Sequence, residues 1–165
     1  MIPTLETDRL LLRPQTMEDW PAYAGLMMSD HAVFMEGPHT LPDAWGMFCH
    51  DLAQWHLLGV GALMIEERES GKCLGQVGIN HGPLFPEHEL GWLVYPEFEG
   101  KGYASEAALA LRDWGFEVRG LATLVSHIDP ENTRSRKLAE RLGAELEVDP
   151  ERPGPDVLVY RHKAP

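Results

Sequence analysis

The stretch from Glu89 to Val118 constrains the fold more than any other part of the chain. Its first seven residues, Glu-Leu-Gly-Trp-Leu-Val-Tyr, are apolar at both alternating sets of positions, which predicts a central strand covered on both sides. From Ser105 onward, small or apolar residues recur with i, i+3, i+4, i+7 spacing, which predicts a helix. Gly100 and Gly102 lie between the two. We therefore expect a strand, a glycine loop and a helix in succession.

A glycine loop that leads into a helix is suited to binding an anion. The first N–H groups of a helix lack intrahelical partners, and the helix dipole is positive at this end. Glycine also lets the backbone approach a ligand closely. The sequence therefore predicts that a phosphate-bearing cofactor binds at the loop and the start of the helix.

Composition narrows the class of partner. The chain has 165 residues, 44% of them hydrophobic, which predicts one globular domain spanning 1–165. Its net charge of −12 disfavours a nucleic-acid partner and favours a cationic or amine-bearing substrate.

The two cysteines, Cys49 and Cys73, provide no disulfide framework. Acids near the N-terminus do not fit a signal peptide, and no apolar run is long enough to span a bilayer. We expect a cytoplasmic protein with no membrane partner, and a homodimer is left open.

Periodicity and turn residues predict the remaining elements. In chain order they are a strand at 9–13, a helix at 16–28 opened by a capping box from Thr16 to Asp19, a loop at 29–41, a helix at 42–58, strands at 62–67 and 73–80, a loop at 81–88, the strand at 89–95, the helix at 105–118, a strand at 123–128, a helix capped by Asp129 or Asn132, and closing strands at 144–148 and 157–160 around a loop at 150–156. The strand–helix–strand order across 89–128 calls for a parallel pair with a right-handed crossover. The sheet is thus expected to be mixed, with helices on both faces.

Three motifs together resemble the GNAT superfamily of acetyl-CoA-dependent N-acetyltransferases, in the branch that includes RimJ and RimL. They are Thr7-x-Arg9-Leu-x-Leu-Arg13 followed by Asp19, then Gly100-Lys-Gly-Tyr-Ala-Ser-Glu-Ala107, then Asn132-x-x-Ser135-x-x-Leu138-x-x-x-Leu142-Gly143. Their order covers almost the whole chain. The resemblance implies an α/β (α+β) fold with a mixed, mostly antiparallel sheet and one splayed parallel strand pair.

The resemblance also implies an activity and a cofactor site. Acetyl-CoA is the implied acetyl donor, without a metal, and the acceptor is a primary amine on a protein N-terminus or a small molecule. The pantetheine arm would lie between the splayed strands, paired with backbone near Leu93 and Val94. The other implied cofactor contacts are Gly100, Lys101, Gly102, Tyr103, Ala104, Asn132 and Lys137. Glu99 stands where the family's loop often has Gln or Arg, so we expect weakened cofactor binding.

Two residues are candidates for proton transfer. The family position of Glu89 implies a base that takes the proton of the amine, although an acid at a strand end is otherwise simply solvated. Glu87, His88 and His81 are alternatives for this role. Ser135 heads an apolar, inward-facing helix stripe, and the resemblance implies that it acts as the acid toward the departing thiolate. Local bonding within the first helical turn is its alternative.

Several alternatives stay open. Arg134, Lys137 and Arg141 form a basic stripe that is either solvated or in contact with the 3′-phosphate of the cofactor. A dinucleotide-binding domain is a poorer fit, because the acid at Asp129 lies 27 positions after Gly102, rather than the usual ~20. A P-loop is excluded, since Gly102 follows Lys101 where Ser or Thr is needed. A catalytically silent CoA-binding sensor remains possible. The histidine and cysteine spacings do not fit a metal site.

Overall fold

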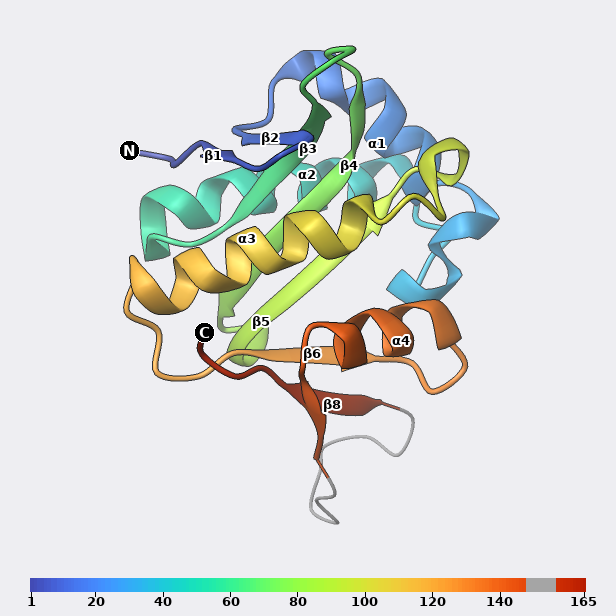
Figure 1. The fold of residues 1–165 in the computed structure, drawn as a ribbon. Helices are drawn as coiled ribbons and strands as arrows, with labels where there is room; N and C mark the ends of the chain where they lie inside the picture. The colour runs from blue at the N-terminus through green and yellow to red at the C-terminus, as the bar shows by residue number, and fades with distance from the viewer. Residues whose placement is uncertain (148–156) are drawn as a thin grey trace.

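The computed structural model describes residues 1–147 and 157–165. In these residues, eight strands form one sheet in the order β1-β2-β3-β4-β5-β6-β8-β7 (Figure 1). The strands are β1 (Leu5–Glu6), β2 (Leu10–Arg13), β3 (Ala62–Glu67), β4 (Cys73–Gly82), β5 (Phe85–Val94), β6 (Val125–Ile128), β7 (Glu145–Leu146) and β8 (Leu158–Arg161). The α-helices are α1 (Trp20–Met27), α2 (Leu41–Leu58), α3 (Tyr103–Glu117) and α4 (Thr133–Arg141). Short 3₁₀ helices are η1 (Met17–Asp19), η2 (Asp30–Met35) and η3 (Pro96–Phe98).

The parallel pair β5–β6 lies inside an otherwise antiparallel sheet. The two strands are in register at Glu89 and Val125, and no further register pair joins them in the described residues. Both strands continue beyond this point, β5 to Val94 and β6 to Ile128, so they separate toward their carboxyl ends. The mixed sheet and the splayed parallel pair expected from the sequence are confirmed.

Helices cover both faces of the sheet. The largest core cluster lies between the strands and α3, where Ala107, Ala108 and Leu111 pack against residues such as Leu10 and Ile79. These small residues form the apolar stripe predicted for the helix, and they let α3 lie close across the sheet (Figure 1). A second cluster joins α1, η2 and α2 on the other face, with Leu93 of β5 packed against it.

The predicted helix ends agree well with the structure. The capping box is present, with the Thr16 N–H donating to the Asp19 carboxylate at 2.8 Å, but its first turn is 3₁₀ rather than α. Of the two possible caps for α4, Asn132 is the one used: its side-chain oxygen accepts the Ser135 N–H at 3.2 Å.

The predicted loop at 81–88 is wrong. β4 runs to Gly82 and β5 begins at Phe85, so the two strands form a hairpin closed by the pair Gly82–Phe85. Pro86 fits near the start of β5, where its missing N–H is tolerated. Glu89 therefore lies within β5 instead of opening it. The loop predicted at 29–41 also contains η2.

The closing strands differ slightly from expectation. β7 covers Glu145–Leu146, and β8 covers Leu158–Arg161 rather than 157–160. Val148 and the loop predicted at 150–156 lie outside the described residues.

Within the described ranges, none of the helices combines the length and the apolar character that crossing a membrane requires.

Candidate active site

The glycine loop precedes α3 in a conformation that suits an anion. Gly100 and Gly102 have φ values of 77° and 80°, a left-handed backbone that a residue with a Cβ rarely adopts. Gly102 is the N-cap of α3. Within the described residues, the N–H groups of Gly102, Tyr103 and Ala104 donate to no acceptor. These donors at the positive end of a fifteen-residue helix fit the pyrophosphate of CoA.

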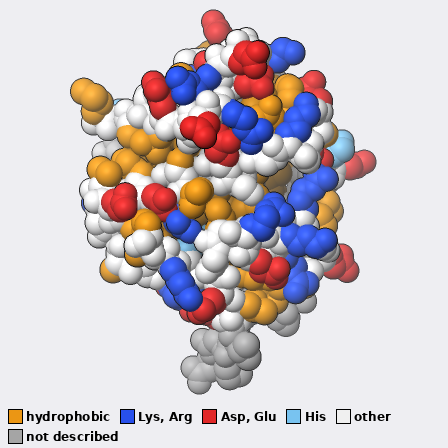
Figure 2. Space-filling model, viewed as in Figure 1, with side chains coloured by type: hydrophobic (Ala, Val, Ile, Leu, Met, Phe, Trp, Pro, Cys, Tyr) orange, Lys and Arg blue, Asp and Glu red, His pale blue; other side chains and the backbone are white. Residues whose placement is uncertain are grey.

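Helix α4 presents basic side chains to this loop. Arg134 forms an ion pair with Glu99, and the Arg141 guanidinium donates to the Ser105 hydroxyl at 3.3 Å. Lys137 lies between the two arginines in sequence and is exposed. Figure 2 shows Lys and Arg side chains gathered over α4 and the neighbouring loop, on the right of the view. The negative charge of Glu99 is thus paired in this structure.

The diverging ends of β5 and β6 expose backbone groups between them. The Tyr95 N–H donates to the Leu74 carbonyl of β4 at 2.8 Å. Strand alternation then directs the N–H and C=O of Leu93 toward β4 and those of Val94 toward the side of β6. On that same side, the Leu90 carbonyl accepts the Ser126 hydroxyl at 2.6 Å. Of the two backbone positions expected to contact a pantetheine arm, Val94 faces the gap and Leu93 does not.

Glu89 has a partner that sequence reasoning did not identify. Its carboxylate lies 3.3 Å from Nδ1 of His127 on β6, at the last point where the two strands are paired. The Glu89 side chain is 18% exposed. His127 is two residues after Val125, so it shares a strand face with the residue paired to Glu89. That relationship requires the parallel register, which the sequence does not specify.

Ser135 lies on the opposite face of β5 from Glu89. Its hydroxyl oxygen accepts a hydrogen bond from the Trp92 indole N–H at 3.2 Å. The Asn132 side chain accepts the Ser135 N–H, and in the described residues the Ser135 hydroxyl forms no hydrogen bond to the first turn of its own helix. In the part of the chain that the structure describes, the hydroxyl proton of Ser135 is donated to no acceptor. It can therefore be donated to a ligand.

The alternative bases are engaged elsewhere. Glu87 forms a two-point ion pair with Arg161, at 2.8 and 3.1 Å, and this pair holds the pKa of Glu87 below its usual range. His88 stacks on His81 with ring centroids 3.9 Å apart. Burial lowers the pKa of His88, with smaller contributions from His81 and Arg119. Among the described residues, neither histidine side chain forms a hydrogen bond or ion pair with the Glu89 carboxylate.

A further carboxylate, Asp51 of α2, lies on the same face of the sheet as Glu89. It accepts hydrogen bonds from the Tyr23 hydroxyl and the Gln76 amide, each at 3.2 Å. Gln76 is the register partner of Leu93 on β5, which places Asp51 alongside the separating end of that strand. Nothing in the spacing of the sequence singled it out, because its partners come from α1 and β4.

A splayed parallel pair, a glycine loop with N–H groups that have no acceptor in the described residues, and a basic helix edge together fit an acyl-CoA-dependent transferase. The family model described as an acetyltransferase (GNAT) domain matches residues 9–145. The chain belongs to the GNAT acetyltransferases. It is an acetyl-CoA-dependent N-acetyltransferase that moves an acetyl group to an amine.

Known proteins resemble the chain over nearly its full length. The crystal structure of an acetyltransferase from Agrobacterium tumefaciens is 57% identical, with a TM-score of 0.94, and the match covers 99% of this chain and 95% of that one. The uncharacterised N-acetyltransferase YnaD of Bacillus subtilis is 38% identical over 87% of this chain and 83% of its own. A coenzyme A complex of RimL, a ribosomal-protein acetyltransferase, shares the fold at a TM-score of 0.78 and 17% identity, covering 98% of each chain. The resemblance to the RimJ and RimL branch is confirmed at the level of fold.

Proposed function

We propose that the chain transfers the acetyl group directly from acetyl-CoA to a positively charged primary amine, with Glu89 as base and Ser135 as hydrogen-bond donor. The observation that carries this proposal is the placement of these two residues on opposite faces of β5, at the point where β5 and β6 separate. The three-residue step from Glu89 to Trp92 spans about 10 Å along β5. A thioester between the strands would thus have a proton acceptor and a hydrogen-bond donor on opposite sides.

Each group has a defined task. The amine must lose a proton before it attacks, and the Glu89 carboxylate accepts that proton. His127 Nδ1 lies 3.3 Å from the carboxylate and can interact with its negative charge. When bound, acetyl-CoA supplies an activated acyl group with a good leaving thiolate. The Ser135 hydroxyl donates to the departing sulfur while Trp92 holds the hydroxyl oxygen. The Val94 N–H, which strand alternation directs to the gap between the strands, is the backbone donor that we propose for the thioester oxygen.

We propose that acetyl-CoA binds to the hydrogen-bond donors and basic side chains described above. Its pyrophosphate takes the free N–H groups at Gly102 to Ala104, with Gly100 and Lys101 completing the loop. Lys137, together with Arg134 and Arg141, lies on the helix edge that would meet the 3′-phosphate. Asn132 caps α4 by accepting the Ser135 N–H. We propose that it contributes to the cofactor site by fixing the position of Ser135.

Charge supports a cationic acceptor. Asp51 of α2 lies over the same sheet face as Glu89. It accepts hydrogen bonds from Tyr23 and Gln76 and lies 3.9 Å from Nδ1 of His50, whose pKa it raises. The net charge of the chain is −12. A polyamine and the N-terminus of a basic peptide both fit this field, and a neutral or acidic amine fits it poorly.

A kinetic screen tests the proposal. CoA release is followed with acetyl-CoA and a panel that includes spermidine, peptides with basic N-termini, and matched neutral and acidic amines. We expect the cationic acceptors to have the highest kcat/KM, and their KM to rise with added salt. A preferred neutral or acidic acceptor, with a KM indifferent to salt, would contradict the charge argument. No turnover with any amine, despite binding of acetyl-CoA, would favour the silent sensor.

A further inference from the structure

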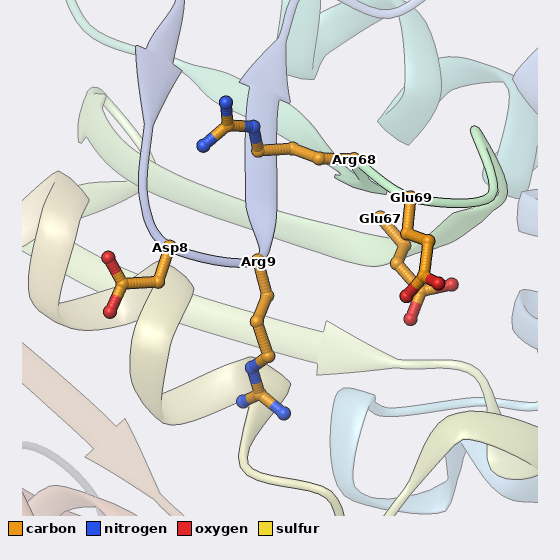
Figure 3. A pocket seen from close by; sticks show the side chains of 5 residues that line it. All are labelled: Asp8, Arg9, Glu67, Arg68 and Glu69. Carbon is orange, nitrogen blue, oxygen red and sulfur yellow. The ribbon is translucent and has the colours of Figure 1, made fainter.

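Arg9 contacts the cofactor loop from the sheet side. It lies just before β2, far from the loop in sequence, and its Nη1 donates to the Lys101 carbonyl at 2.9 Å. Its guanidinium carbon lies 4.5 Å from the centre of the Tyr103 ring, a cation–π distance. Figure 3 shows the Arg9 side chain extending from the start of β2 toward the first turn of α3. One side chain thus touches both ends of the Lys101–Tyr103 segment.

Glu106, in the first turn of α3, holds Arg9 in place. Its carboxylate accepts the Arg9 Nε at 2.8 Å, the Arg9 backbone N–H at 3.0 Å and the Thr7 hydroxyl at 2.5 Å. Burial alone would raise the pKa of Glu106, but these hydrogen bonds outweigh burial and keep its pKa below the usual range. The Arg9 guanidinium is therefore fixed in position and is not a freely moving surface charge.

Tyr103 is held from its other end as well. Its hydroxyl donates to the carboxylate of Glu67, at the end of β3, at 2.7 Å. Glu67 and Arg9 both line the open cavity of about 450 Å³ shown in Figure 3, together with Asp8, Arg68 and Glu69. The start of α3 is thus tied to two neighbouring strands.

The geometry of one peptide bond connects these contacts to the anion site. A trans peptide unit is planar, with its N–H directed opposite to its C=O. Because Arg9 binds the Lys101 carbonyl on the sheet side, the Gly102 N–H of the same peptide unit points away from the sheet. Without that bond the peptide could rotate and turn a carbonyl oxygen toward a bound phosphate, which would repel it.

We propose that Arg9, anchored by Thr7 and Glu106, is a positioning residue of the cofactor site that orients the 100–104 loop for the pyrophosphate. This inference rests on the proposed binding of acetyl-CoA at that loop. Arg9 acts through the orientation of the loop and not through its own contact with the phosphates. The opening motif and the glycine loop, far apart in sequence, thus form one functional unit.

Two measurements test the proposal on Arg9→Gln, Arg9→Lys and Glu106→Gln. Calorimetry gives the Kd of acetyl-CoA, and native-state trypsin digestion with mass spectrometry gives the rate of cleavage after Lys101. We expect Arg9→Gln to raise the Kd roughly tenfold or more, because a charge-assisted hydrogen bond is lost, and to speed cleavage after Lys101. The kcat at saturating acetyl-CoA should stay within about twofold of wild type.

Arg68→Gln is the matched control. Arg68 lines the same cavity, has similar exposure to Arg9 (48% against 44%) and bonds the Thr7 carbonyl, so the charge change and the neighbourhood are shared. In the described residues, its side chain forms no hydrogen bond or ion pair with the 100–104 loop. Its Kd and its cleavage rate after Lys101 should both match wild type.

Glu106→Gln distinguishes the positioning of Arg9 from a direct effect of charge on acetyl-CoA binding. It removes a negative charge beside the anion site, so electrostatics alone predicts tighter binding, whereas loss of the Arg9 anchor predicts a severalfold higher Kd and faster cleavage. Tighter binding by Glu106→Gln, full rescue by Arg9→Lys, or unchanged cleavage after Lys101 in all variants would overturn the proposal. Cleavage needs no cofactor, so a wild-type protein that fails to bind acetyl-CoA would refute the proposed cofactor site and leave this test of the loop intact.

Discussion

The indole N–H of Trp92 donates to the Ser135 hydroxyl oxygen at 3.2 Å, which links β5 to α4 across the gap where β5 and β6 separate. A serine hydroxyl that accepts from one side can still donate from the other. The bond therefore orients the Ser135 hydroxyl and leaves its proton free to be donated to a ligand. This is the arrangement expected of a group that assists a leaving thiolate, and it differs from a hydroxyl that caps its own helix.

Replacing Ser135 by Ala should lower kcat roughly tenfold to a few hundredfold, less than a full general acid contributes, because a thiolate needs only modest assistance. The affinity for acetyl-CoA should barely change. Steady-state kinetics of Ser135→Ala and Ser135→Cys, with thermal melts, make the comparison. Trp92→Phe, which removes the donor but not the hydroxyl, should show a smaller loss. An alanine variant that melts earlier but turns over normally would make Ser135 structural.

Glu99→Gln should strengthen acetyl-CoA binding. The change removes an acid beside the pyrophosphate loop and releases Arg134, which Glu99 now pairs with. Because the Arg134 and Glu99 side chains are 65% and 38% exposed, solvent screens the pair, and we expect a decrease in Kd of roughly two- to tenfold, largest at low salt. Calorimetry at two salt concentrations measures it. Glu97→Gln, two residues earlier, is a control for charge alone. Weaker binding by Glu99→Gln would show instead that the Glu99–Arg134 pair supports the loop.

His162 predicts a pH dependence of stability. Its Nε2 lies 2.8 Å from the Ser126 hydroxyl, which donates its proton to the Leu90 carbonyl, so Nε2 carries the hydrogen. Burial lowers the pKa of His162 to about 4, and Arg112 adds to this shift. The pKa of a histidine in an unfolded chain is about 6.5. Between these values the unfolded chain binds more protons, so the free energy of unfolding should fall as pH drops through this window.

The expected loss between about pH 6.5 and 4 is up to about 3 kcal/mol. Urea unfolding of wild type and His162→Gln at several pH values in this window measures it. Gln cannot take up the proton, so the variant should lose less stability on acidification. Equal losses in both proteins would assign the acid sensitivity to other groups, such as the ion-paired carboxylates.

Much of the fold follows from local sequence pattern. The apolar run after Glu89, the glycines at 100 and 102 and the small residues of α3 each predict an element that the structure contains. The cap of α4 at Asn132 is also a local signal. The β4–β5 hairpin was missed because Gly82, Pro83 and Pro86 suggest a loop, whereas pairing with the long neighbouring strand overrides that local preference.

The candidate site was less predictable, because its contacts join distant segments. The Glu89–His127 contact depends on the parallel register, and Trp92–Ser135 depends on where α4 lies against β5. Arg9 matched a motif, but its contact with the Lys101 carbonyl depends on how α3 lies beside β2. A sequence pattern can suggest such residues, and only their packing shows which atoms meet.

The pH–rate profile of Glu89→Gln tests the central claim most directly. Gln keeps the shape of the side chain but cannot accept the amine proton, so kcat/KM for the acceptor near neutral pH should fall about 10²–10⁴-fold. The acidic limb of the wild-type profile should disappear with it. Glu117→Gln, an exposed acid at the far end of α3, should behave as wild type. If Glu89→Gln instead keeps a near-wild-type rate and an unchanged acidic limb, Glu89 is not the base and the proposed transfer is contradicted.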